Sequence, residues 1–215
     1  LLDEPLANLD AKLRRRMRAE IRRIQKVTNI TTIFVTHDQE EAMAIGDRMA
    51  VLRDGIVEQI GTSGELYRAP GNVFVANFIG KMNFFRGRVE TSGDKGVLVR
   101  IADSIEIRPE PRRIKVPGGV EAGQDVFVGA RPEQVTVSSE ESGAGIPGTV
   151  SVVQNLGQIT RYEIEVGSEV ATDTLEVDMG DPLEEVGEGD RVFVRVDSSR
   201  VLVFLPEQVS DMTET

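Results

Sequence analysis

The pattern of hydrophobic residues changes near Gly80, and this change limits the folds that the chain can adopt. Before Gly80, helical periodicity alternates with short runs of β-branched residues, which is typical of an α/β domain. After it, short segments of period two follow one another, separated by turn-forming residues and without a helix-length pattern between them. The sequence therefore predicts two domains, an α/β domain over residues 1–80 and an all-β domain over residues 81–215.

The distribution of charge supports the same division. Residues 1–80 carry equal numbers of acidic and basic side chains, so the formal net charge of −11 falls entirely on residues 81–215. An acidic surface repels phosphate backbones, and we therefore expect no nucleic-acid partner. The chain has no cysteine and one histidine, which excludes disulfides, cysteine-ligated metals and multi-histidine metal sites. It shows neither a membrane-spanning apolar run nor a signal peptide, and its start without Met suggests a piece of a longer protein.

Several helices and strands are predicted in the first domain. The best-defined helix, over residues 11–28, has an apolar face, arginines on its other faces, and Asn8 or Asp10 as its N-cap. We interpret the arginines as a solvated face. Shorter helices are predicted over residues 38–45, 63–68 and 72–79. Strands are predicted at residues 1–2 and 31–36, and a hairpin over residues 48–60 turns at Asp54-Gly55.

A weak internal repeat runs through the second domain. Residues 85–89 resemble residues 146–150, and residues 123–128 resemble residues 189–194. We expect two copies of a small five- or six-stranded barrel. The barrels are expected to close their own sheet edges and to fold without help.

Three side chains with useful chemistry follow two of the predicted strands. Asp3 and Glu4 come directly after the strand at residues 1–2, and His37, the single histidine, follows the strand over residues 31–36. Ligands of open α/β sheets bind at the carboxyl ends of the strands, where an Asp can hold Mg²⁺ and a Glu can accept a proton from water. We expect these side chains to meet at one sheet edge. A turn with two solvated acids is the alternative interpretation.

The first domain resembles the latter part of the ATPase subunit of an ABC transporter. The resemblance rests on Leu1–Asp10 (LLDEPLANLD) and on Val35–Thr62, and it extends to about residue 80. It implies that Asp3 organises Mg²⁺ through water, that Glu4 polarises the attacking water, and that His37 contacts the γ-phosphate of ATP. It also implies a D-loop that touches an opposing subunit, formed by Ala7, Asn8, Leu9 and Asp10.

The second domain resembles the paired TOBE domains, small OB-like barrels that follow the ATPase in importers for sugars and polyamines. The segments that carry this resemblance are Val128–Glu133 and Leu156-Gly157 followed by Thr160–Glu165. The expected fold is thus an α/β remnant of a P-loop ATPase domain followed by a regulatory, all-β tandem OB-like domain. The implied partners are a second copy of the chain, the membrane-spanning permease subunits and, indirectly, an external solute-binding protein. The implied location is the cytoplasmic face of the cell membrane.

The sequence lacks three motifs of the ABC ATPase pattern. It contains no Gly-x-x-x-x-Gly-Lys-Ser/Thr phosphate loop, no Leu-Ser-Gly-Gly-Gln signature and no Gln loop. Without a phosphate loop, no lysine or backbone amides hold the phosphates of ATP, and we expect the chain alone to bind neither ATP nor Mg²⁺ and to be inactive. The expected function is to form part of the ATP-hydrolysing subunit of an importer for polyamines or sugars.

Two other functions were compared with this one. The first is a stand-alone TOBE module that binds an oxyanion, which the acidic composition of residues 81–215 disfavours. The second is an OB-type nucleic-acid binder, which requires a basic groove and exposed aromatic platforms that this domain lacks.

Overall fold

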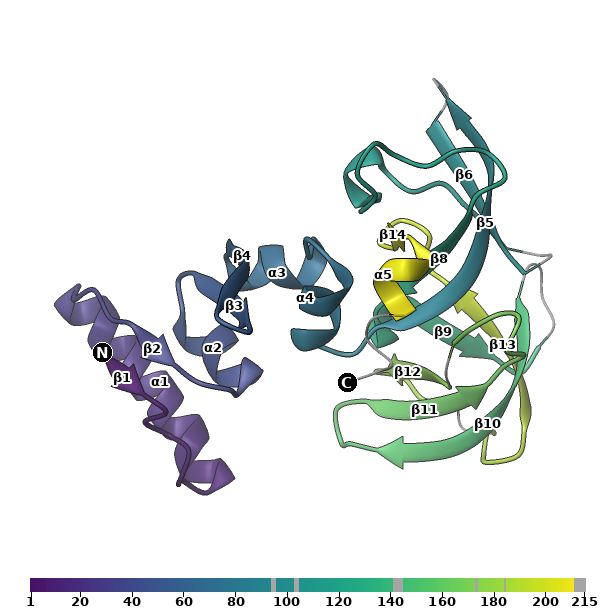
Figure 1. Cartoon of the computed structure of the whole chain (residues 1–215). Helices are drawn as coiled ribbons and strands as arrows, with labels where there is room; N and C mark the ends of the chain where they lie inside the picture. Colours follow the sequence, from purple (N-terminus) through teal and green to yellow (C-terminus); the bar gives the residue numbers. More distant parts are fainter. Residues whose placement is uncertain (94–95, 103–104, 141–144, 173, 184, 211–215) are drawn as a thin grey trace. The chain divides into compact units, whose positions relative to one another are not determined.

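The computed structural model describes the chain except residues 94–95, 103–104, 141–144, 173, 184 and 211–215 (Figure 1). Its residues form two compact units. The first holds Leu1–Gly71 and Val75–Gly80, and the second holds Asn72–Phe74 and the chain from Lys81 onward. None of the helices described here is long and apolar enough to cross a membrane.

The first unit contains two strand pairs and the helices of the α/β region. Strands β1 (Leu2–Asp3) and β2 (Phe34–Val35) pair in parallel, whereas β3 (Met49–Arg53) and β4 (Ile56–Gly61) form an antiparallel hairpin. The helices are α1 (Ala11–Thr28), α2 (Gln39–Ile45), α3 (Ser63–Arg68) and α4 (Val73–Phe78), of which α4 begins with two residues assigned to the second unit. These elements confirm the predictions apart from small differences at their ends. The exception is the strand predicted over residues 31–36. Only Phe34 and Val35 form it, opposite the two residues of β1, its one partner among the described strands.

Helix α1 begins and ends at residues that the sequence marks. The Asp10 carboxylate accepts hydrogen bonds of 3.0 Å from the backbone N–H groups of Lys12 and Leu13, which otherwise lack partners at a helix start. At the other end, Asn29 adopts the left-handed conformation, with φ of 53°, and its N–H donates to the carbonyl of Gln25. Asp10 rather than Asn8 is therefore the N-cap.

The arginines of α1 join this helix to α2 and to residues just before and after α2. No residue of α1 is buried, so these contacts lie at the surface. The ion pairs are Arg14–Asp38 (3.5 Å), Arg18–Glu40 (3.0 Å) and Arg22–Asp47 (2.6 Å). The interpretation of the arginines as a purely solvated face is therefore incomplete, because several of them connect helices.

The second unit is built mainly from two five-stranded antiparallel sheets, among the residues that the structure describes. One sheet has the order β14 (Leu202–Phe204), β8 (Asp125–Ala130), β5 (Asn83–Gly93), β6 (Gly96–Ile101), β7 (Ile105–Ile107). The other has the order β12 (Leu175–Met179), β11 (Thr160–Glu165), β10 (Ile146–Asn155), β13 (Arg191–Val196), β9 (Val135–Ser138). Short helical turns at Pro111–Arg113, Pro132–Gln134 and α5 (Pro206–Ser210) connect or follow the strands.

The internal repeat is confirmed by the backbone. Strand β5 pairs with β6 and β8, and in the same way β10 pairs with β11 and β13. The register shifts directly after Val89 in β5 and directly after Val150 in β10. The turns that precede β8 and β13 also match. The N–H of Gly123 (φ 85°) donates to the carbonyl of Val89 at 2.7 Å. Likewise, the N–H of Gly189 (φ 87°) donates to the carbonyl of Val150 at 2.8 Å. The first repeat comprises β5–β9 and the second comprises β10–β14.

The last strand of each repeat pairs with the other repeat. Strand β9 adds to β13, and β14 adds to β8, as can be followed in Figure 1. Both repeats contribute to one hydrophobic core, which includes Phe85, Tyr162, Val192 and Val203. The prediction of two barrels that each close their own edges is therefore wrong: the hydrogen-bonded order of each sheet is open, and each sheet needs a strand from the other repeat.

A glycine at the same position of each repeat lets neighbouring strands approach closely. A Cβ atom at Gly148 would lie 2.6 Å from Cγ2 of Ile164 and 3.0 Å from the carbonyl oxygen of Glu165, and one at Gly87 would lie 2.9 Å from Cγ1 of Val99. These distances are shorter than van der Waals contact, so a side chain would force the strands apart.

We predict that Gly148→Ala lowers the free energy of unfolding of the second unit by about 1–3 kcal/mol, because the added methyl overpacks the core. Urea denaturation measures this change. Gly180→Ala is the matched control, since nothing lies within 4 Å of its Cβ position. If the two substitutions lowered the free energy of unfolding equally, close packing of the strands would not be the reason for a glycine at position 148.

Candidate functional site

The parallel pairing of β1 and β2 brings Glu4 and His37 together. The register pairs Leu2 with Phe34 and Asp3 with Val35, so the two strands end at the same edge. Glu4 follows β1 directly, and His37 lies two residues beyond β2. The Glu4 Oε1 atom is 3.0 Å from His37 Nδ1, which is hydrogen-bond distance.

The backbone at Glu4 turns its side chain toward the site. Glu4 has a φ of 42°, in the left-handed region that non-glycine residues seldom adopt. Two backbone hydrogen bonds hold it there: its N–H donates to the carbonyl of Val35 at 2.9 Å, and its carbonyl accepts from Ala7 at 3.3 Å. Such conformations persist where surrounding contacts hold them, and they are frequent at functional sites.

A hydrogen-bond network fixes the backbone on both sides of His37. The Thr36 hydroxyl accepts from the N–H of Asp38 (3.0 Å) and donates to the carboxylate of Glu41 (2.8 Å). Asp38 caps α2 by accepting from the N–H of Glu41 at 3.0 Å. Arg14 of α1 lies 3.5 Å from the Asp38 carboxylate and 3.6 Å from that of Glu41, which is buried. This network therefore limits where His37 can lie.

Sequence reasoning did not single out this network. The acidic first turn of the helix over residues 38–45 was visible, and an Asp three residues before a Glu is a pattern of helix starts. The role of Arg14 had no such signal, because the sequence does not show which of the arginines of α1 faces α2.

The electrostatic surroundings favour the charged form of His37. The hydrogen bond with the Glu4 carboxylate raises the pKa of His37 above its ordinary value, and the negative charges of Glu4, Asp38 and Glu41 act in the same direction. The side chains of His37 and Glu4 are 75% and 48% exposed, so solvent and ligands reach both. The exposed pair can exchange protons with a bound molecule.

Asp3 lies at the same edge. Its side chain is exposed and makes no hydrogen bond or ion pair with a described residue. A carboxylate in this position can contact Mg²⁺ directly or through water. The described residues hold no cluster of three or more His, Asp and Glu side chains suited to a metal ion.

The segment expected to form a D-loop is a turn between β1 and α1. Leu6 is buried and anchors the turn, and its carbonyl accepts from the N–H of Leu9 at 3.2 Å. Ala7 and Asn8 are exposed, Leu9 is half-buried, and Asp10 caps α1. The turn thus presents a small exposed surface beside Glu4.

Comparison with known families identifies the domains of the second unit. The family model described as the MalK OB fold domain matches residues 81–135, and the TOBE domain model matches residues 128–204. The ten strands of the two repeats lie largely within these two ranges. One solved structure, a cytoplasmic molybdate-binding protein ModG, matches with a TM-score of 0.41 and 16% identity, over 58% of this chain and 96% of that protein. That likeness is too low to carry an argument.

Comparison with curated proteins extends the similarity to the first unit. The maltose/maltodextrin import ATP-binding protein MalK of Photobacterium profundum is 44% identical, over 84% of this chain and 50% of that protein. The spermidine/putrescine import ATP-binding protein PotA of Marinobacter nauticus is 44% identical, over 70% of this chain and 39% of that protein. The Fe(3+) ions import ATP-binding protein FbpC of Fusobacterium nucleatum is 33% identical, over 100% of this chain and 54% of that protein.

The chain spans about half the length of these curated relatives. The matched regions include the first unit as well as both β repeats, so the similarity is not confined to the TOBE domains. The chain therefore carries the MalK OB-fold and TOBE domains, and it is similar over both of its units to ATP-binding subunits of ABC importers.

Proposed function

We propose that this chain acts within the ATP-hydrolysing subunit of an ABC importer, and that the first unit supplies part of the catalytic site. The observation that carries this proposal is the 3.0 Å contact between Glu4 and His37 at the shared end of two parallel strands. The same residues lie in a chain that is 44% identical to import ATP-binding proteins. An exposed carboxylate paired with an imidazole at a sheet edge suits proton transfer to and from a nucleotide site.

Each of the three side chains has a distinct proposed role. Glu4 accepts a proton from the attacking water, because its carboxylate projects beyond the strand end. His37 donates its Nδ1–H to Glu4, which orients both groups and leaves Nε2 for a phosphate oxygen. Asp3 contacts Mg²⁺ through water. Bound MgATP supplies the phosphoryl group and the metal charge that this reaction needs.

The chain does not contain all of the parts that phosphoryl transfer requires. No phosphate loop occurs in the 215 residues, and so we assign the binding of the β- and γ-phosphates to residues outside this sequence. The first unit is accordingly proposed as a remnant of a P-loop ATPase domain. The exposed turn of Ala7, Asn8, Leu9 and Asp10 is proposed to contact a second copy of the subunit.

The second unit is proposed to regulate the subunit and to contribute to its dimer. The permease subunits would hold the assembly at the inner face of the cell membrane, with an external binding protein acting on them indirectly. The solute is proposed to be a polyamine or a sugar, because relatives at 44% identity are named for spermidine/putrescine and maltose/maltodextrin import. These relatives favour an importer subunit over a stand-alone oxyanion-binding module.

The pairing of Glu4 and His37 predicts a shift in the histidine titration. We expect His37 to titrate above the ordinary pKa of about 6.5, because the Glu4 carboxylate stabilises the imidazolium. Glu4→Gln removes this charge and lowers the pKa, so that the ring loses its proton at a lower pH. NMR of the ring protons measures this directly, since His37 is the single histidine of the chain.

Glu40→Gln is the control for this titration. Glu40 pairs with Arg18 and does not contribute to the raised pKa of His37. We expect this variant to titrate like the wild type. A pKa of His37 that responds equally to Glu4→Gln and Glu40→Gln would mean that the two side chains do not pair in solution.

The proposed role of Glu4 predicts a loss of turnover in the complete subunit that contains this sequence. Glu4→Gln should lower ATP hydrolysis by about 10²–10⁴-fold, because it removes the proton acceptor, while ATP binding is retained. Phosphate release and nucleotide binding measure the two effects. Glu40→Gln should hydrolyse ATP at nearly the wild-type rate, and the 215-residue chain alone gives the baseline without hydrolysis. Turnover of Glu4→Gln within a few-fold of wild type would remove Glu4 from the mechanism.

A further inference from the structure

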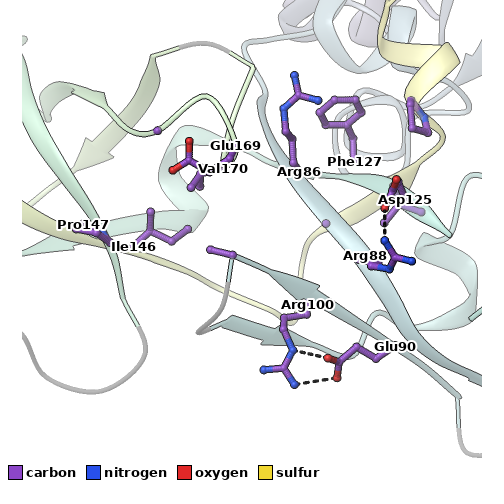
Figure 2. Close-up of a pocket in the computed structure, with 15 residues that line it drawn as sticks. Arg86, Arg88, Glu90, Arg100, Asp125, Phe127, Ile146, Pro147, Glu169 and Val170 are labelled. Atoms are coloured by element: carbon purple, nitrogen blue, oxygen red, sulfur yellow. Dashed lines mark hydrogen bonds and ion pairs between the residues drawn. The ribbon is translucent and has the colours of Figure 1, made fainter. Parts of the chain in front are cut away.

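The second unit contains an open cleft with a volume of about 910 Å³, which we call the first cleft (Figure 2). One wall comes from strands β5, β6 and β8 of the first repeat, and includes Arg86, Arg88 and Arg100. The other wall comes from the second repeat, and includes Glu169 and Val170. Clefts of roughly 300–1,000 Å³ are the size that binds small organic molecules.

A smaller cleft of about 440 Å³ lies at the equivalent place of the second repeat, and we call it the second cleft. The strand registers establish the equivalence. In the first repeat, Arg88 pairs across the sheet with Asp125 on one side and with Arg100 on the other. In the second repeat, Thr149 pairs with Arg191 and Glu165 in the same way.

The two clefts share a backbone but differ in chemistry. The residues at equivalent positions, first repeat then second, are Arg86 and Pro147, Arg88 and Thr149, Arg100 and Glu165, and Asp125 and Arg191. Pro147 lines both clefts. The fold accepts Pro, Thr and Glu where the first repeat has arginines. The cluster of arginines is therefore not a requirement of the sheet, and it stands out in the part of the chain that carries the whole net negative charge.

Two of the three arginines are paired with carboxylates. Arg100 donates to both carboxylate oxygens of Glu90, and Arg88 lies 3.6 Å from Asp125. Figure 2 shows both ion pairs at the cleft. The charge of Arg100 is thus balanced by a two-bond pair, whereas Arg88 is balanced by a longer ion pair between exposed side chains.

Arg86 differs from its neighbours. Its Nε donates to the carbonyl of Ser168 at 2.9 Å, and its guanidinium lies 5.3 Å from the centre of the Phe127 ring, beside which it stands in Figure 2. It forms no ion pair with a described carboxylate, and its two terminal nitrogens have no acceptor among the described residues. The guanidinium of Arg86 is therefore positioned by these contacts, and its exposed terminal N–H groups can donate hydrogen bonds to an anion.

We propose that the first cleft binds a small organic anion whose carboxylate or phosphate group pairs with Arg86. A guanidinium fork binds both of these groups through two parallel hydrogen bonds. Phe127, Val170 and Ile146 belong to the cleft lining and are buried, so that Phe127 and Val170 offer a small apolar surface to the ligand. The cleft has room for an organic portion beyond the anionic group. This inference does not depend on the proposed ATPase function.

Glu169 limits the charge of the ligand. It lines the wall opposite Arg86 and makes no ion pair with a described residue. A second negative group at that end of the ligand would face this carboxylate and be repelled. The fitting ligand has one anionic group at the Arg86 end and a neutral or cationic remainder.

NMR titration of the ¹⁵N-labelled 215-residue chain tests the proposal. The probes are sodium benzoate, phenyl phosphate, inorganic phosphate and molybdate, with benzyl alcohol as the uncharged analogue. We expect saturable shifts of the amides of Gly87, Phe127 and Val170 with benzoate or phenyl phosphate, at a dissociation constant of about 1 mM or tighter. Benzoate and phenyl phosphate together distinguish a carboxylate site from a phosphate site.

Two matched variants locate the site. Arg86→Ala should weaken binding by at least about tenfold, since a charge-assisted pair is lost, whereas Arg191→Ala in the second cleft should leave it unchanged. The dispersion of the amide spectrum shows that each variant is folded. The proposal is overturned if no organic probe saturates, if benzyl alcohol or an inorganic anion binds as tightly as the organic anions, or if the two variants have equal effects.

Discussion

The exchange of the last strand between the two repeats is the constraint on which the second unit depends. Strand β9 completes the sheet of the second repeat and β14 completes that of the first, so neither five-stranded sheet forms from one repeat alone. Side chains from both repeats, such as Phe85 and Val192, consequently share one core. The same interleaving explains why the first cleft has walls from both repeats.

Polar side chains reinforce this interleaving at the beginning of β5. The buried Asn83 side chain donates to the carbonyl of Glu176 at 2.7 Å and accepts from its N–H at 2.9 Å, which joins β5 to β12 of the other repeat. Within the first repeat, the buried Arg131 donates to the carbonyl of Lys81 at 3.1 Å and so joins the end of β8 to the start of β5. Because buried polar groups are costly without partners, these contacts favour one arrangement of the strands over others.

Local features of the structure could be predicted from the sequence, whereas pairings between distant segments could not. The cap at Asp10, the turn at Asp54-Gly55 and the strand positions follow from residue types over a few positions. The meeting of Glu4 and His37 also followed, because parallel strands end at one edge. The exchange of β9 and β14 did not follow, since periodicity defines a strand but not its partner.

The first cleft was missed for a related reason. The repeat in the sequence already matches Arg86 with Pro147 and Arg88 with Thr149, but most surface arginines are simply solvated. Arg100 is distant in sequence, and only the strand register places it beside Arg88 and matches it with Glu165. The network of Arg14, Asp38 and Glu41 beside His37 could not be predicted either, because the sequence does not show how α1 packs against α2.

The central functional claim is that Glu4 and His37 act as one unit in ATP hydrolysis. A double-mutant cycle in the complete subunit tests it most directly, with turnover measured for Glu4→Gln, His37→Ala and the double variant. If the side chains act together, the double variant is about as slow as the slower single variant, because the second substitution removes nothing further. If the two losses multiply, the residues act independently and the claim is contradicted.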